Sequence, residues 1–247
     1  MKHFFQALRF LTVFPLGKDE DLTADDLAAS TIYYPIVGVL LGLVLFVCWQ
    51  WGRTTWPIFL ASALTVALWA GLTAGLHLDG LMDTFDGLGV RGDMERRLAA
   101  MRDSQVGAFG VQSAVFMIFL KIAAVSALAA NPAHFPALIL APLAGRTAMV
   151  ALMSTCSYVR AGEGLGRVFV EGTGRWHLAA AVLFFLFLGL LVVGSAIFLV
   201  FLWQAVMLFL LRRFFLNNFG GATGDLLGAA CEMHELSVLI LVPLILL

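Results

Sequence analysis

LAAAVLFFLFLGLLVVGSAIFLVFLWQAVMLFLL, residues 178–211, is a run of 34 residues without a single charged side chain. A helix crosses the hydrocarbon core of a bilayer with about 20 apolar residues, so the run is too long for one ordinary span. We expect a break at Gly194-Ser195, where small residues interrupt the apolar pattern, although one long tilted helix is an alternative. In either case the run predicts membrane-spanning helix.

The rest of the chain has the same character. Of its 247 residues 61% are hydrophobic and only 13% are charged, which is more apolar than a soluble domain. We predict about seven spans and therefore an all-α, polytopic membrane helix bundle. The spans are Ile32–Trp51, Pro57–Leu76, Val106–Ala130, Phe135–Cys156, Leu178–Val193, Ala196–Leu211 and Leu226–Leu247. No linker or internal repeat divides the chain, so we expect residues 1–247 to form a single integral-membrane domain.

The placement of positive charge predicts the orientation of these spans. Twelve lysines and arginines fall on one predicted side of the membrane, and only Arg53 falls on the other. By the positive-inside rule the N-terminus is cytoplasmic. The segment Phe4–Leu16 lacks the features of a signal peptide and suggests an interfacial helix. A net charge of −1 gives no reason to expect nucleic acid as a partner.

The stretch His77-Leu-Asp-Gly-Leu-Met-Asp-Thr-Phe-Asp-Gly87 carries the strongest chemical signal. At about 100° per residue, Asp79, Asp83 and Asp86 fall within about 60° of one another on a helix. Three crowded anions repel one another unless a cation neutralises them, and hard oxygen ligands suit Mg²⁺ or Mn²⁺. We therefore predict a metal site at the cytoplasmic surface, with Asp103 as a further ligand from the following loop.

Three further groups of polar residues lie at or near the same side. The segment Glu95–Ser104 predicts a short amphipathic helix whose arginines are candidates for binding phosphate or anionic lipid. Arg146 lies close enough to the cytoplasmic end of its span to reach an anionic substrate, whereas the deeper Lys121 is expected to pair with Glu232 or Glu235. The last group is the glycine turn Gly220–Asp225.

The turn Gly220-Gly-Ala-Thr-Gly-Asp225 precedes the last predicted helix. Backbone N–H groups at a helix N-terminus bind phosphate, so Gly221 and Gly224 are candidate phosphate contacts. Gly162–Arg167 is a similar but weaker loop, more simply explained as a connector. Carboxylates, arginines and glycine turns gathered at one membrane surface indicate metal-assisted transfer of a phosphoryl-linked group, but they do not name a substrate.

The chain resembles the cobalamin synthase family of integral-membrane adenosylcobinamide-GDP ribazoletransferases. The residues that carry the resemblance are, in chain order, Phe10-Leu11-Thr12 with Pro15, Tyr34-Pro35-Ile36-Val37-Gly38, His77–Gly87, Met101-Arg102-Asp103-Ser104 with Gly107 and Phe109-Gly110, Gly145-Arg146, Gly164-Leu165-Gly166, and Gly220–Asp225 with Gly228. Each motif is weak alone, but their joint order is specific. Many relatives are expected to have Lys at Arg102 and Arg at Gln105, so we assign no phosphate-binding role to position 105.

The resemblance implies a Mg²⁺-dependent enzyme in the bacterial inner membrane, with its active site facing the cytoplasm. It implies that a hydroxyl of α-ribazole, or of its 5′-phosphate, attacks adenosylcobinamide-GDP and releases GMP. Carried onto this sequence, the metal ligands are Asp79, Asp83, Asp86 and Asp103, the phosphate contacts include Arg97, Arg102 and Arg146, and the catalytic acids are Asp83, Asp103 and Asp225. Membrane lipid is a further expected partner, and a homo-oligomer stays open.

Three other classes compete with this interpretation. CDP-alcohol phosphotransferases place Ala-Arg soon after Asp-Gly, where this chain has Leu88-Gly89. Aspartate-rich prenyltransferases carry two acidic clusters, whereas the region of Asp225 supplies one acid before Glu232. A cation transporter would place acids near the bilayer midplane within an inverted repeat, and the acids here are predicted to lie at one surface.

Overall fold

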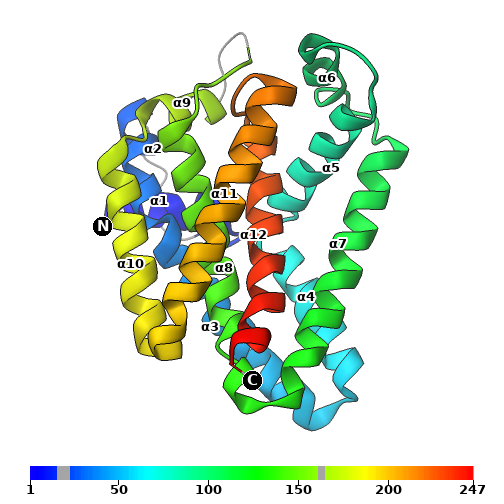
Figure 1. The fold of residues 1–247 in the computed structure, drawn as a ribbon, viewed down its shortest axis with the longest axis vertical. Helices are drawn as coiled ribbons and strands as arrows, with labels where there is room; N and C mark the ends of the chain where they lie inside the picture. The colour runs from blue at the N-terminus through cyan, green and yellow to red at the C-terminus, as the bar shows by residue number, and fades with distance from the viewer. Residues whose placement is uncertain (16–22, 161–164, 247) are drawn as a thin grey trace.

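The computed structural model describes residues 1–15, 23–160 and 165–246. Within these ranges the chain is almost wholly helical, which confirms the predicted all-α bundle (Figure 1). The helices of the first half are α1 (Lys2–Leu11), α2 (Ala24–Ser30), η1 (Thr31–Tyr33), α3 (Tyr34–Thr55), α4 (Ile58–Leu72), α5 (Leu76–Gly89), α6 (Met94–Ala100) and α7 (Ala108–Ala127). The second half contains η2 (Leu128–Ala130), η3 (Pro132–His134), α8 (Ala137–Thr155), α9 (Leu165–Gly172), α10 (Arg175–Val193), η4 (Gly194–Ala196), α11 (Ile197–Phe219) and α12 (Gly224–Ile245).

Several helices are long and apolar enough to cross a membrane. Among the described residues there are five such stretches, or six if α4 and α5 together form one broken span. The longest, Arg175–Phe219, is interrupted at Gly194, where φ is 60° and α10 turns back into α11 (Figure 1). The predicted break at Gly194-Ser195 is therefore confirmed. The chain is a multi-pass membrane protein, and the count of seven spans stays a prediction.

The second predicted span contains a sharp corner. Helix α4 ends at Leu72 instead of Leu76, and the axis bends by 88° before α5 begins. Ala74 and Gly75 make the corner with φ values of 50° and 68°, in the left-handed region that glycine adopts at low cost. The apolar pattern continues through the corner, so hydropathy does not reveal it. The bend aims the aspartate helix α5 away from the α4 axis.

Helix α8 forms the centre of the bundle, between α3 and α12. Glycines allow this close packing, since a Cβ atom at Gly38 of α3 would lie 2.6 Å from the carbonyl oxygen of Pro142. On the opposite side, a Cβ atom at Gly145 would lie 2.7 Å from Cys231 Sγ of α12. Small residues at helix interfaces let backbones approach in a membrane, where dispersion contacts drive association. Helix α12 is thereby fixed against the core, and its N-terminal end reaches the same end of the molecule as α6 and α9 (Figure 1).

Candidate functional site

The site is built where α5 crosses α12. A Cβ atom at Gly80 would lie 2.8 Å from the carbonyl oxygen of Asp225, and one at Gly228 would lie 3.1 Å from that of His77. Because the two backbones nearly touch, the acids of α5 and the first turn of α12 come together. The half-buried carboxylate of Asp83 is repelled by the charges of Asp225 and Asp79. The crossing thus gathers three of the predicted site acids.

Arg160 supplies a positive charge to this group. The backbone N–H of Ala222 donates to the Ser157 carbonyl at 2.9 Å, and that of Val159 donates to the Ala222 carbonyl at 3.2 Å. These bonds hold the segment after α8 beside the start of α12. Nη2 of Arg160 pairs with Asp225 and also donates to the Met101 carbonyl at 3.4 Å. The charge of Arg160 also acts favourably on Asp83.

Sequence reasoning used Arg160 only as an orientation charge and missed its place in the site. Its Nε is buried and has no hydrogen-bond partner among the residues that the structure describes. The available signal was its position two residues before the glycine loop Gly162–Arg167. Residues 162–164 of that loop lie outside the described residues, but Gly166 packs closely on α12, since a Cβ atom there would lie 3.2 Å from the Gly224 backbone nitrogen. Gly166, in the first turn of α9, therefore lies beside the N-terminus of α12.

Asp86 has a different surrounding from Asp79 and Asp83. Its two carboxylate oxygens accept hydrogen bonds from the backbone N–H groups of Gly107 and Gly110, both at 2.7 Å. Asp86 therefore satisfies two of the unpaired donors at the N-terminus of α7 and complements the positive end of its dipole. The structure gives this acid a clear structural role, while its predicted part in metal binding stays a prediction.

The loop residues predicted for the site lie around its edge. Asp103 is exposed, and its Oδ1 accepts a hydrogen bond from the Gln105 backbone N–H at 2.9 Å. Arg102 is also exposed, and Arg97 of α6 donates to the Asn218 side chain of α11. Helix α6 confirms the short helix predicted within Glu95–Ser104. Met101, the residue before Arg102, links this loop to the site, because its backbone carbonyl accepts a hydrogen bond from Arg160.

The two predicted glycines of the last turn have different surroundings. Gly221 is buried, and a Cβ atom there would lie 2.4 Å from the Ser157 carbonyl oxygen, so glycine permits the backbone pairing that positions Arg160. Gly224 is exposed at the first position of α12, and no atom of the described residues would lie within 4 Å of a Cβ atom there. Thr223 caps the helix by accepting a hydrogen bond from the Leu226 N–H at 3.2 Å. Gly224 is thus the more accessible phosphate candidate.

Arg146 lies within a buried charge network and away from any exposed surface. It is fully buried and pairs with Glu235, which also pairs with Lys121. Lys121 in turn contacts Glu232 at 2.8 Å, which confirms the predicted pairing of this lysine. The four charges sum to zero, as burial in a membrane requires. The expectation that Arg146 reaches an anionic substrate from the cytoplasmic end is not met by this conformation, because one Nη of Arg146 pairs with Glu235 and the side chain is fully buried.

The donor set at the crossing fits a divalent cation in its chemistry. Asp79, Asp83 and Asp225 offer hard carboxylate oxygens of the kind that Mg²⁺ binds. In the described parts of the chain, however, no three acidic, histidine or cysteine side chains are grouped closely enough to hold an ion as they stand. Asp225 is directed to Arg160 instead. Binding of a metal by all three acids would require Asp225 to exchange this partner.

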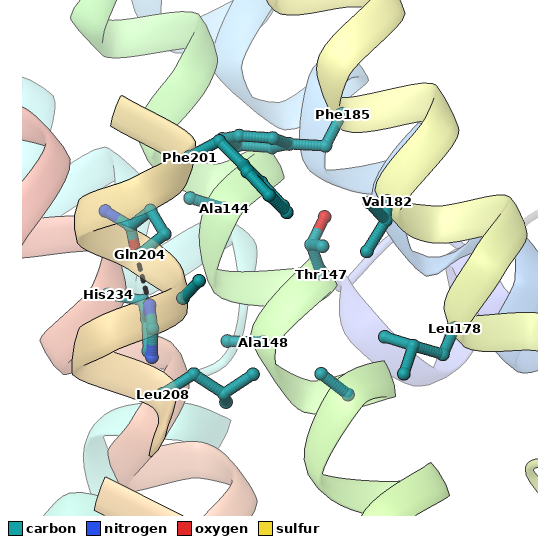
Figure 2. Close-up of a pocket in the computed structure, with 12 residues that line it drawn as sticks. Ala144, Thr147, Ala148, Leu178, Val182, Phe185, Phe201, Gln204, Leu208 and His234 are labelled. Carbon is teal, nitrogen blue, oxygen red and sulfur yellow. Dashed lines mark hydrogen bonds between the residues drawn. The ribbon is translucent and has the colours of Figure 1, made fainter. Parts of the chain in front are cut away.

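The cavity drawn in Figure 2 has a different character. It lies between α8, α10 and α11, and its walls are almost entirely apolar. Its polar groups are Thr147 and the hydrogen-bonded pair Gln204 and His234 (Figure 2). A cavity without a charged side chain offers nothing to stabilise a phosphate group. The α5–α12 crossing, in contrast, carries both carboxylates and a guanidinium.

Comparison with known proteins gives a consistent result. Residues 3–243 match a family model described as cobalamin-5-phosphate synthase. Three curated relatives are named adenosylcobinamide-GDP ribazoletransferase. The chain is 39% identical to the protein of Ectopseudomonas mendocina, over 96% of this chain and 97% of the relative. It is 38% identical to that of Pseudomonas savastanoi pv. phaseolicola, over 99% and 100%, and 33% identical to that of Acetivibrio thermocellus, over 98% and 97%. No solved structure matches the chain.

Proposed function

The chain belongs to the cobalamin-5-phosphate synthase family, and on that premise we propose that it is an adenosylcobinamide-GDP ribazoletransferase of the bacterial inner membrane. It joins α-ribazole, or its 5′-phosphate, to adenosylcobinamide-GDP. The product is adenosylcobalamin, or its 5′-phosphate, and GMP is released. The observation that carries the proposal is the meeting of Asp79, Asp83 and Asp225 with Arg160 where α5 crosses α12.

The reaction replaces a phosphoanhydride bond of adenosylcobinamide-GDP with a phosphodiester bond to the acceptor. A ribose hydroxyl oxygen of the acceptor forms a bond to the phosphorus nearer cobinamide, and the bond from that phosphorus to the oxygen of the GMP phosphate breaks. The hydroxyl proton passes to a carboxylate, for which Asp83 and Asp225 are our candidates. Negative charge accumulates on the phosphoryl oxygens during the transfer, and a guanidinium such as Arg160 stabilises it through paired N–H donors.

We propose that Mg²⁺ binds to Asp79, Asp83 and Asp225, with Asp86 nearby. Asp103, in the loop after α6, stays a candidate for a further ligand. When bound, the ion neutralises the diphosphate and its leaving group. The N-terminus of α12 is exposed at Gly224, and we propose that its backbone N–H groups and helix dipole bind a phosphate group of the donor substrate. Arg97 and Arg102, on the α6 side of the site, supply further positive charge to the nucleotide. The active site faces the cytoplasm, where the positive-inside rule places most of the basic residues.

The test uses the purified protein in detergent with both substrates. With Mg²⁺ we expect a joined corrinoid and one GMP per product molecule. Treatment with a chelator should abolish turnover, and added Mg²⁺ should restore it. Formation of product at an undiminished rate in the chelator would remove the metal from the proposal. Cation flux in liposomes without any release of GMP would instead support a transporter and contradict the proposal as a whole.

A further inference from the structure

A groove lies beside the acid site, between α1 and the corner that joins α4 to α5. Its volume is about 510 Å³, within the range of about 300–1,000 Å³ that is usual for small-molecule sites. Asp79 lines the groove and also belongs to the acid group at the α5–α12 crossing. The groove and the proposed reaction site therefore share Asp79.

The shape of the groove is fixed by the backbone. Ala74 and Gly75 turn the chain by their left-handed φ values, so α5 leaves α4 at 88°. The backbone N–H of Val13 donates to the Leu72 carbonyl at 2.8 Å, which ties the end of α1 to this corner. Phe10 of α1 packs against Phe169 with ring centroids 4.7 Å apart. These contacts hold the two walls in place, so the groove is largely formed before a ligand binds.

The lining of the groove selects by charge and polarity. One wall is apolar and includes Phe10, Leu78 and Met82. Among the described residues, the charged groups of the lining are one guanidinium, Arg9, and one carboxylate, Asp79. The proposed function assigns the diphosphate of the donor substrate to the metal ion and Arg160 at the α5–α12 crossing, which leaves the groove, with its single arginine, for the other substrate. An aromatic nucleoside with one phosphate or none matches this balance of apolar surface and charge.

We propose that this groove binds the acceptor nucleoside, α-ribazole or its 5′-phosphate, an assignment that rests on the proposed function. The base lies against the apolar wall of Phe10, Leu78 and Met82. The ribose is directed to Asp79, which brings its hydroxyl to the edge of the acid site. Arg9 binds the 5′-phosphate when the acceptor carries one.

Leu76→Trp tests the assignment, because Leu76 lines the groove and is 40% exposed, so a larger side chain narrows the groove without entering the core. Leu60→Trp is the matched control, since Leu60 lies on α4, outside the groove lining, and is 44% exposed. For Leu76→Trp we expect the KM of the acceptor to rise by about tenfold or more, with the KM of adenosylcobinamide-GDP unchanged. Leu60→Trp should leave both constants unchanged.

Arg9→Gln is a second variant, which tests the proposed contact with the 5′-phosphate. It should raise the KM of α-ribazole 5′-phosphate by about tenfold and leave that of α-ribazole unchanged. Equilibrium dialysis of labelled α-ribazole, without the second substrate, gives a readout besides turnover and should show weaker binding to Leu76→Trp than to the wild type.

The outcomes separate this inference from the proposed function. A rise only in the KM of adenosylcobinamide-GDP would assign the groove to the other substrate and overturn the inference. Unchanged KM values for both substrates in Leu76→Trp would mean that the groove holds lipid or nothing, and this result would also overturn the inference. A third outcome separates the two proposals. If the wild type binds α-ribazole saturably, Leu76→Trp weakens that binding, and the wild type never releases GMP, the groove assignment is supported and the proposed function is contradicted.

Discussion

Nη2 of Arg160 donates a hydrogen bond to Oδ2 of Asp225, and this ion pair joins the segment after α8 to the first turn of α12. Both side chains are mostly buried, with 16% and 20% of their surfaces exposed. Several neighbouring charges act on Asp83. Among those of the described residues that act most strongly, Arg160 is the positive one and the others are carboxylates. Arg160 thus holds one carboxylate of the site and partly neutralises another, as a bound cation would.

Replacement of this arginine should affect the reaction more than the fold. We expect Arg160→Gln to lower kcat by about 10²-fold or more, because loss of one preorganised donor to a transition-state oxyanion has an effect of that order. Arg160→Lys should recover only a small part, since an ammonium group cannot form the paired contacts of a guanidinium. The measurement is kcat for GMP release, with the melting temperature as a check on folding. Wild-type kcat in Arg160→Gln would assign the ion pair to structure alone.

Asp83 is the acid most surrounded by other site charges. Asp83→Asn keeps the size of the side chain but removes its charge, so GMP release should fall to near background. The control is Asp25→Asn, which changes an exposed acid in the first turn of α2. That variant should retain full activity. Normal turnover by Asp83→Asn at saturating Mg²⁺ would exclude this residue from both metal binding and proton transfer.

Gly80 sets the distance between α5 and α12. In Gly80→Ala the added methyl group would meet the Asp225 carbonyl oxygen at 2.8 Å and its Cα at 2.9 Å, so the helices must separate. We expect a loss of about 1–3 kcal/mol in the free energy of unfolding, together with a lower kcat. Gly71→Ala is the control, because no atom of the described residues lies within 4 Å of its added methyl group. Equal stability and activity of the two variants would show that the helices do not meet as described.

The buried charge network predicts a stability effect. Glu235→Gln leaves Arg146 and Lys121 with one carboxylate, Glu232, between them, and removal of one member of a buried pair costs about 3–5 kcal/mol. The control is Glu171→Gln, which breaks the exposed pair with Arg167 and should cost at most about 0.5 kcal/mol. Thermal unfolding in detergent measures both. A melting temperature of Glu235→Gln equal to that of the control would contradict a structural role for the network.

Much of the architecture follows from local sequence. The uncharged run 178–211, its break at Gly194 and the aspartate helix could be predicted because hydropathy and helical periodicity depend on neighbouring residues. The pairing of Lys121 followed from the cost of an isolated charge in a membrane. These features need no knowledge of how the helices pack.

Other features were decided by packing between distant parts of the chain. No local pattern shows that Asp86 caps α7, that Glu235 holds Arg146, or that Arg160 meets Asp225. The sequence by itself determined that the chain is a membrane protein, because a bilayer sorts side chains by polarity, and that three acids share one helix face, because their spacing follows the helical period. Only the tertiary structure decided which charge neutralises which, since a cation acts on an anion through their distance, and the crossing of α5 over α12 at Gly80 sets that distance.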